Sequence, residues 1–484
     1  MTNKKLDIQI KQYLNDNWDQ ICEDISSLIS IPSSINDGEF NETYPNGEGA
    51  CKAMKQALKI SKRMGFITKN HKNMIGIADL PGASKTQLGF IGHCDVVVPG
   101  PGWHFDPYKL NIVNNYMIGR GIIDDKGPSV ILLHAINFWI QQNKKLPYSI
   151  RFLFGTDEET FSTDVKTYKE DFEEPKLIVT PDADFPVPYG EKGLMRFYVN
   201  SKINNGEIIE IYAGDSNNAV PGRAVAIIDG KDKWIDATTS RLAHAIKIVR
   251  LDDGNIKIIA IGRGAHAAEP FEGIDAIAVL MHFLIEKNIG SKEEQEFFKF
   301  LIKIAGRPHG EKVGINCSDE HFKHLTIAAT SLRYKKGKIS QVFDVRFPTC
   351  TTPDKIIKQI SKEIPKNAKI KLIKAFGPFI VNPKSKVINA LSKAYTEATG
   401  EESKLFTMGG ATYARCFKCA TSFGPLRSWI PTPAWVGTLH GPDEGMSISE
   451  MQTSFNIYVY AIKYLMELDL DDENFTKDTM ELSE

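Results

Sequence analysis

The sequence predicts an α/β fold, in which a parallel or mixed sheet is covered by helices on both faces and interrupted by an inserted α+β domain. The first observation is that short apolar runs alternate with helical runs up to residue 193. The second is a change of character over 194–383, where alternating apolar and polar stretches appear. The third is Asn382-Pro383, a typical element boundary, after which helical spacing returns. A chain of 484 residues has room for such an insert, at about 100–200 residues per domain.

The first part of the chain alternates between predicted helices and buried strands. Apolar residues at helical spacing predict helices over 5–30, 50–64 and 129–142. Continuous apolar runs predict strands at 88–92, 148–154 and 177–180. Strands that alternate with helices favour a parallel or mixed sheet.

The insert and the return segment complete the predicted organisation. We expect strands at 194–200 and 257–261 and helices over 274–287, 294–305 and 385–399. Residues 467–484 carry eight acids against one lysine and are expected to form a solvated tail or a frayed helix end. These patterns divide the chain into a first part, 1–193, an insert, 194–383, and a final part, 384–484.

Composition argues against several classes of function. Lys and Arg number 59 and Asp and Glu number 60, so the net charge of -1 offers no basic surplus for a nucleic-acid backbone. The most apolar run, 130–140, is interrupted by His134 and Asn137 and is too short to span a bilayer. The N-terminus lacks the apolar segment of a secretory signal, and the seven cysteines form no regular framework. We expect a cytoplasmic protein with free thiols that binds neither nucleic acid nor membrane.

Potential metal ligands follow the first predicted strand and precede the next helix. His93 and Asp95 come after the strand at 88–92, and residues i and i+2 of an extended chain point the same way. Taken alone, this pair is more typical of a hydrogen-bonded histidine near a strand end than of a metal site. Asp124 and Asp125 lie in a glycine-rich turn before the helix at 129–142. A carboxylate there can bridge two cations, or it can cap the helix.

Three consecutive acids follow the predicted strand at 148–154. Asp157, Glu158 and Glu159 repel one another at a buried strand end unless cations neutralise them, although a solvated acidic turn is the alternative. Adjacent side chains point to different sides, so one glutamate can bind a metal ion while the other acts as a general base. Asp182 and His440, each in its own loop, add another carboxylate and another imidazole.

Together these side chains make a mixed nitrogen and oxygen ligand set. Such a set suits Zn²⁺, or else Mn²⁺ or Co²⁺, better than Ca²⁺. Two neighbouring ions would need a bridging carboxylate and a bridging water, an arrangement that drives hydrolysis near neutral pH. Open α/β sheets place their sites at the carboxyl ends of strands, which agrees with the positions of these loops.

The order of the motifs resembles that of the co-catalytic di-zinc amidohydrolases, which include aminoacylases, carboxypeptidases, desuccinylases and dipeptidases. The matching residues are His93-x-Asp95, Asp124-Asp125-Lys126-Gly127, Glu158-Glu159, Asp182, His266 and His440. Within this superfamily the chain is most similar to the bacterial PepV-type (Xaa-His) dipeptidases. That similarity rests on the motif at 119–128, Gly155-Thr-Asp-Glu-Glu159, Thr180-Pro-Asp-Ala183 and the long insert.

The resemblance implies a catalytic domain formed by the first and final parts, with the insert as a lid. It implies two divalent ions, one held by His93, Asp124 and Asp182 and the other by Asp124, Glu159 and His440. Asp95 would orient His93, and Glu158 would be the general base beside the metal ligand Glu159. The Asp124–Asp125 peptide bond is expected to be cis.

The resemblance also assigns substrate contacts. His266 of the lid would donate to the tetrahedral oxyanion, an interaction worth about 3–4 kcal/mol in typical mutational series. Asn218 and Arg346 match lid positions that bind the substrate carboxylate, for which a planar guanidinium is suited. Arg415, in the glycine-rich segment 409–415, is a further candidate. Surface or core roles are the alternatives for His266 and Arg346.

We therefore expect a monomeric metallo-dipeptidase that acts on short unblocked peptides. An N-acyl amino acid deacylase or a succinyl-diaminopimelate desuccinylase is the alternative with the same ions. A metal-bound peptide-binding protein without activity is the alternative of another class, and the presence of Glu158 beside Glu159 argues against it.

Overall fold

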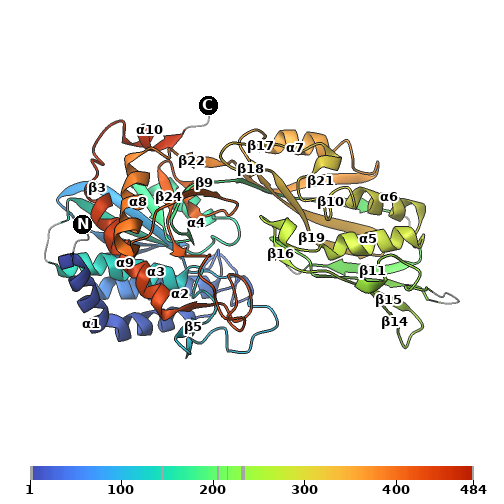
Figure 1. Ribbon diagram of the computed structural model, residues 1–484, viewed down its shortest axis with the longest axis horizontal. Helices are drawn as coiled ribbons and strands as arrows, with labels where there is room; N and C mark the ends of the chain where they lie inside the picture. The colour runs from blue at the N-terminus through green and yellow to red at the C-terminus, as the bar shows by residue number, and fades with distance from the viewer. Residues whose placement is uncertain (1–3, 143–145, 204–205, 215, 231–234, 482–484) are drawn as a thin grey trace. The chain divides into compact units, whose positions relative to one another are not determined.

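The computed structural model describes residues 4–142, 146–203, 206–214, 216–230 and 235–481 (Figure 1). The chain forms two compact units. The first unit comprises Met1–Gly190, Phe379–Phe406 and Thr412–Glu484, and the second comprises Glu191–Pro378 and Thr407–Ala411.

A six-stranded mixed sheet organises the first unit, with the strand order β1-β2-β6-β3-β7-β24. Its strands are β1 (Ile67–His71), β2 (Ile75–Leu80), β3 (Ser84–His93), β6 (Tyr148–Gly155), β7 (Leu177–Thr180) and β24 (Ala420–Ser422). The pairs from β6 through β3 and β7 to β24 are parallel, whereas β1 and β2 add antiparallel pairs at one edge. The predicted mixed sheet is therefore confirmed.

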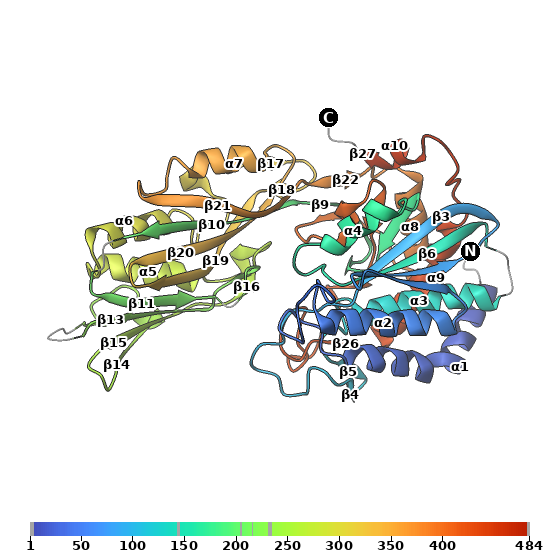
Figure 2. The ribbon, with the colours of Figure 1, turned by 180° about the vertical axis from the view of Figure 1, so that it is seen from behind.

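Both faces of this sheet are covered, because successive residues of a strand point to opposite faces. On β3, Phe90 packs into the larger core cluster with α1 (Lys4–Ile29), α2 (Glu48–Arg63), α3 (Lys126–Gln141), α8 (Lys386–Thr399) and α9 (Ile448–Leu465). The next residue, Ile91, packs on the other face with Tyr168 of α4 (Thr163–Asp171) and Tyr413 of η4 (Tyr413–Cys416). Figure 2 shows these helices around the sheet.

Three small sheets complete the first unit and its connections. They contain β4 (Asn111–Val113) and β5 (Tyr116–Ile118) with β26 (Gly445–Ser447), β8 (Ala183–Asp184) with β25 (Pro425–Leu426), and β23 (Leu405–Met408), β9 (Val187–Glu191) and β22 (Phe379–Val381) with β27 (Met480–Glu481). The expectation of a solvated acidic tail is wrong for part of that segment. Leu470, Phe475 and Met480 are buried, and α10 (Phe475–Thr479) leads into β27, so these apolar side chains fix the segment despite its charge.

An eight-stranded antiparallel sheet organises the second unit, with the order β14-β15-β13-β11-β19-β20-β10-β21. Its strands are β10 (Gly193–Lys202), β11 (Ile208–Ala213), β13 (Arg223–Ile228), β14 (Ile246–Arg250), β15 (Ile256–Ile261), β19 (Thr326–Lys335), β20 (Lys338–Phe347) and β21 (Ala368–Phe376). The helices α5 (Ala276–Glu286), α6 (Lys292–Leu301) and α7 (Pro353–Ile360) share one core cluster with the sheet. Asp275 and Ser291 cap α5 and α6 through their side chains, which fixes where these two predicted helices begin.

The second unit also contains short elements, of which β16 (Ala265–His266) carries His266 and β12 (Ala219–Val220) begins directly after Asn218. The others are β17 (Ser318–Asp319), β18 (Lys323–His324), η1 (Ala243–Ala245), η2 (Pro270–Glu272) and η3 (Glu311–Val313). All seven cysteines are free thiols. Among the helices that the structure describes, none combines the length and the apolar character needed to cross a bilayer.

Candidate metal centre

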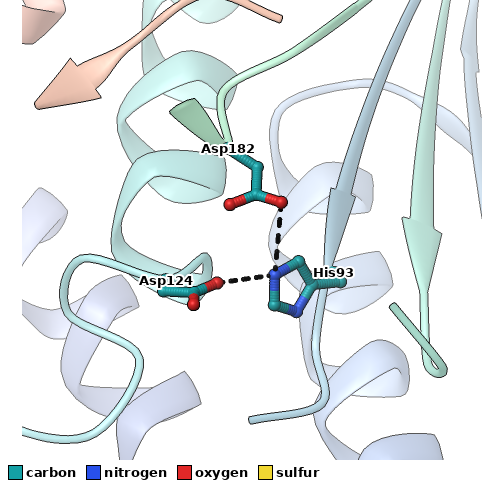
Figure 3. A group of neighbouring side chains, drawn as sticks. All are labelled: His93, Asp124 and Asp182. Atoms are coloured by element: carbon teal, nitrogen blue, oxygen red, sulfur yellow. Dashed lines mark hydrogen bonds and ion pairs between the residues drawn. The ribbon is translucent and has the colours of Figure 1, made fainter. Parts of the chain in front are cut away.

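Three of the predicted ligands meet at the carboxyl ends of two parallel strands. His93 is the last residue of β3, Asp182 follows β7, and Asp124 lies in the loop before α3. Their ligand atoms all lie within 4.8 Å of one another. Figure 3 shows both carboxylates turned toward the same imidazole nitrogen, with His93 Nε2 at 2.8 Å from Asp124 Oδ1 and 3.9 Å from Asp182 Oδ2.

A second group of three shares Asp124 with the first. It adds Glu159, from the loop after β6, and His440, which lies 316 residues beyond Asp124 in the chain. His440 Nε2 is 2.8 Å from Asp124 Oδ2 and 3.4 Å from Glu159 Oε1. Each oxygen of Asp124 therefore faces a different imidazole, which is the placement required of a carboxylate that bridges two ions.

The ring of His93 is held by its other nitrogen. Nδ1 lies 2.9 Å from the backbone carbonyl oxygen of Asp95, which can only accept, so Nδ1 carries a hydrogen and Nε2 is the nitrogen that could bind a metal ion. The Asp95 carboxylate is farther away, at 3.5 Å. It accepts instead from the backbone N–H groups of Glu158, at 3.3 Å, and Glu159, at 3.1 Å. Asp95 thus orients His93 through its main chain and the two glutamates through its side chain.

Asp125 supports the site by binding the main chain of His93. The Asp124–Asp125 peptide bond is cis, as the resemblance predicted. The Asp125 carboxylate is fully buried and accepts from the backbone N–H of His93, at 3.1 Å, and from Ser129 Oγ, at 3.0 Å. Asp125 occupies the N-cap position of α3, as the alternative expected, but its side chain makes no capping bond to the helix.

The carboxylates of this centre are crowded and mostly shielded from water. Burial raises the pKa of Glu158 to about 8, and Glu159, Asp124 and Asp95 add to the rise while His93 opposes it. Burial and the charge of Asp124 likewise raise the pKa of Asp182 well above its usual range. For His93, burial alone would lower the pKa, but the nearby carboxylates of Asp124 and Asp95 raise it well above its ordinary value. The site therefore gathers more carboxyl groups than its two imidazoles can balance.

The donor set fits divalent ions. Two imidazoles and several carboxylates supply the nitrogen and oxygen ligands that Zn²⁺, Mn²⁺ and Co²⁺ accept. Within the described part of the chain, Glu159 Oε1 is a buried atom that makes no hydrogen bond, although it faces His440. A buried polar atom without a hydrogen bond costs free energy unless an ion or water satisfies it, so Glu159 also fits a ligand role.

The loop that carries Glu158 and Glu159 rests on partners that the sequence analysis missed. Asp164 of α4 is buried and accepts from the backbone N–H of Thr156, at 2.6 Å, and of Asp157, at 3.2 Å. The hydroxyl of Tyr413 donates to the same carboxylate, and its ring lies edge-on to that of His93. Tyr413 belongs to the glycine-rich motif at 409–415, but nothing in the sequence links that motif to α4.

Two other missed residues are Arg120 and Glu444. Arg120 lies four residues before Asp124 and Glu444 four residues after His440, and both are fully buried. They pair with each other across 324 residues of chain. Their one signal in the sequence was a charge four residues from a predicted ligand, and no local spacing connects the two residues.

His266 and Asn218 are neighbours in the second unit. His266 pairs with Ala219 in the β12–β16 ladder, and the carbonyl of Asn218 accepts from Ala267 at 2.8 Å. The side chain of His266 is exposed, and its Nδ1 accepts from the backbone N–H of Ala268 at 3.3 Å.

Arg346 is buried in the second unit and Arg415 is half-buried in the first. The Arg346 guanidinium binds the buried carboxylate of Asp344, which also binds Arg196. It also donates to the carbonyl of Gly409 at 2.7 Å, so it contacts the glycine-rich segment directly. The structure thus brings the five metal-ligand candidates together with Asp95 and Glu158 in one unit. It places His266, Asn218 and Arg346 in the other.

Known proteins that resemble this chain in sequence or in fold include several peptidases. Residues 89–464 match peptidase family M20/M25/M40. The chain is 30% identical over 481 residues to a Beta-Ala-Xaa dipeptidase of Lactobacillus delbrueckii subsp. lactis, covering 97% of this chain and 100% of the relative. Its fold resembles those of human carnosine dipeptidase 1 and of the di-peptidase Dug1p from Saccharomyces cerevisiae. Each has a TM-score of 0.60 at 15% identity, over 95% of this chain and 99% and 98% of theirs. The family match spans the predicted ligands from His93 to His440, and the chain therefore belongs to peptidase family M20/M25/M40.

Proposed function

We propose that the chain is a metal-dependent dipeptidase that hydrolyses the peptide bond of short unblocked peptides. The observation that carries this proposal is the shared carboxylate of Asp124, whose two oxygens each lie 2.8 Å from a different imidazole. The names of its relatives support the substrate class, since they include a Beta-Ala-Xaa dipeptidase and a carnosine dipeptidase.

Two divalent ions fit the site. His93 and Asp182 would hold one, Glu159 and His440 would hold the other, and Asp124 would bind both. When bound, such ions polarise the scissile carbonyl and lower the pKa of a water molecule. The ligand set favours Zn²⁺, with Mn²⁺ and Co²⁺ as the other candidates.

Glu158 is the proton carrier in this proposal. It lies beside the ligand Glu159, and the Asp95 carboxylate holds the backbone N–H of both residues. Glu158 takes a proton from the attacking water and passes it to the nitrogen of the leaving amine. Burial favours its protonated form, whereas nearby cations favour the carboxylate, so Glu158 is suited to do both in turn.

The remaining roles rest on the resemblance. The second unit acts as the lid, His266 donates to the oxyanion, and Asn218, Arg346 and Arg415 bind the substrate. Arg346 would do so together with Gly409, which it already contacts. The division at 193 and 383, the monomeric state and the cytoplasmic location belong to the same proposal.

An assay on defined substrates tests the proposed reaction. Protein stripped of metal and reloaded with Zn²⁺ or Mn²⁺ is expected to hydrolyse dipeptides and to leave N-acetyl and N-succinyl amino acids intact. Glu158→Gln should lower kcat by about 10²–10⁴-fold, because the general base is lost, while the ion content stays at two per chain. The matched control is Glu170→Gln, an exposed glutamate of α4, which should retain full activity.

The other outcomes select the alternatives. Turnover of N-acyl amino acids without dipeptide cleavage would favour the deacylase or desuccinylase. Peptide binding without turnover of any substrate would favour the binding protein.

A further inference from the structure

Arg120 and Glu444 form a buried ion pair that contacts the main chain of the candidate metal centre. Arg120 is 1% exposed and Glu444 is 0% exposed, and Arg120 Nη1 binds Glu444 Oε2. The ring of Trp103 lies against the guanidinium, with the two centres 5.2 Å apart. A buried ion pair adds little net stability on average, because the cost of removing both charges from water offsets their attraction. The hydrogen bonds that the two side chains make to the backbone are therefore more informative about their role than the ion pair itself.

The atoms of Arg120 and Glu444 that are not used in the ion pair bind the backbone at two metal-ligand candidates. Glu444 Oε1 accepts from the N–H groups of Ile123, at 2.8 Å, and Asp124, at 3.3 Å. Arg120 Nη2 donates to the carbonyls of His440 and Gly441, each at 3.1 Å. One ion pair thus connects the main chain at Asp124 to the main chain at His440.

The backbone at His440 needs such support. His440 has φ +62° and Asp443 has φ +54°, in the left-handed region that non-glycine residues seldom adopt. Such conformations persist when surrounding contacts fix them. Arg120 supplies two of these contacts, and the Asp443 carboxylate accepts from the N–H groups of His104 and Phe105, at 2.8 and 3.2 Å. The segment is therefore held at both ends.

We propose that Arg120 and Glu444 are positioning residues that set the spacing between Asp124 and His440, and so the affinity for the ion that these two residues share with Glu159. The inference rests on the proposed two-ion centre. The effect should be larger for this ion, because the pair holds the main chain of both Asp124 and His440. The other ion shares only Asp124 with the pair, since its ligand His93 is oriented by Asp95 and Asp125.

The test measures ion binding rather than activity. Metal-free protein is titrated with Zn²⁺ by calorimetry, and bound zinc is counted by elemental analysis. We expect wild type to bind two ions. Arg120→Lys and Glu444→Gln should bind the ion of the His440 group about 10–100-fold more weakly, the usual range for partners that support a ligand, and should lose less affinity for the ion of the His93 group. Lysine keeps the charge but cannot reach the glutamate and both carbonyls at once.

A matched control separates this role from a general loss of structure. Arg427 forms a comparable ion pair in the same unit, with bonds of 2.7 and 2.8 Å to Glu450. Arg427→Lys should leave both zinc affinities unchanged. Circular dichroism checks folding, and Glu444→Gln, which keeps the size and the accepting oxygen, is the variant expected to fold most like wild type.

The other possible results of the zinc titration would contradict either the positioning role or the two-ion centre. Variants that bind two ions as tightly as wild type would overturn the inference and leave the two-ion centre intact. Variants that lose both ions together with their folded signal would show a structural role and would also overturn it. A wild-type protein that binds fewer than two ions would refute the proposed function itself.

Discussion

Two buried histidine–aspartate contacts of the first unit, His134–Asp24 and His93–Asp124, have opposite surroundings. His134 Nε2 lies 2.9 Å from Asp24 Oδ2, and His93 Nε2 lies 2.8 Å from Asp124 Oδ1. At the first contact, Arg63 binds the same aspartate at 2.5 Å, and the other imidazole nitrogen meets the hydroxyl of Tyr13 at 3.1 Å. Each charge and each polar atom of that contact has a partner, so the His134–Asp24 pair is closed.

The metal centre is not balanced in this way. Asp124 faces two imidazoles, and Asp182 and Glu159 stand beside them. The imbalance also appears in the imidazoles: the pKa of His93 lies well above its usual value, whereas burial lowers that of His134. The comparison teaches that a buried histidine–aspartate contact alone does not mark an ion site. The excess of carboxylates around it does.

Removing the shared carboxylate should have the largest effect. Asp124→Ala is expected to abolish binding of both ions, because each group of three loses a ligand. The activity should then fall further than it does when the general base is removed, a change that lowers kcat by about 10²–10⁴-fold. Elemental analysis and dipeptide turnover measure the two effects.

The closed pair provides the control for this variant. Asp24→Ala should lower the melting temperature, since it leaves Arg63 and His134 without their carboxylate, yet it should keep two ions and the specific activity of the folded fraction. If Asp24→Ala lost ions as readily as Asp124→Ala, the contrast between the two contacts would be wrong.

Removing the ions should have the next largest effect, which is a loss of stability of the folded protein. Chelation leaves the crowded carboxylates without counter-charges, and an ion present at 100 times its Kd stabilises the folded state by about 2.7 kcal/mol. We expect the melting temperature to fall by about 5 °C per ion lost, as measured by calorimetry with and without chelator. The Asp124→Ala protein should show no such shift, and a shift of equal size in that variant would mean that the chelator acts elsewhere.

Much of the centre could be predicted from sequence because its ligands follow buried strands in a recognisable order. His93, Asp182 and Glu159 each stand at or just after the end of a parallel strand, where chain direction alone brings them together. The fold class followed from the same alternation of strands and helices. Asp95 shows the limit, since the sequence could not tell that its carbonyl, and not its carboxylate, lies closer to His93.

Residues that support the ligands were missed because their partners are distant in sequence. Arg120 and Glu444 meet across 324 residues, and Tyr413 and Asp164 across 249. Periodicity and motif spacing describe neighbours along the chain, so they carry no information about such pairs. The acidic segment near residue 475 was misjudged for a related reason. Its charge is evident in the sequence, but the burial of Phe475 depends on a surface formed elsewhere.

The smallest expected effect is a pH dependence that belongs to the closed pair. Burial lowers the pKa of His134 below its ordinary 6.5, and the hydrogen bond to Asp24 only partly opposes this. Below about pH 6.5 the unfolded chain therefore binds a proton that the folded chain excludes, so stability falls as the pH falls. In the zinc-loaded protein, His134→Gln should flatten the slope of melting temperature between pH 7.5 and about 5.5. The exposed His244→Gln should leave that slope unchanged. A slope that survives His134→Gln in full would show that the closed pair does not titrate in this range.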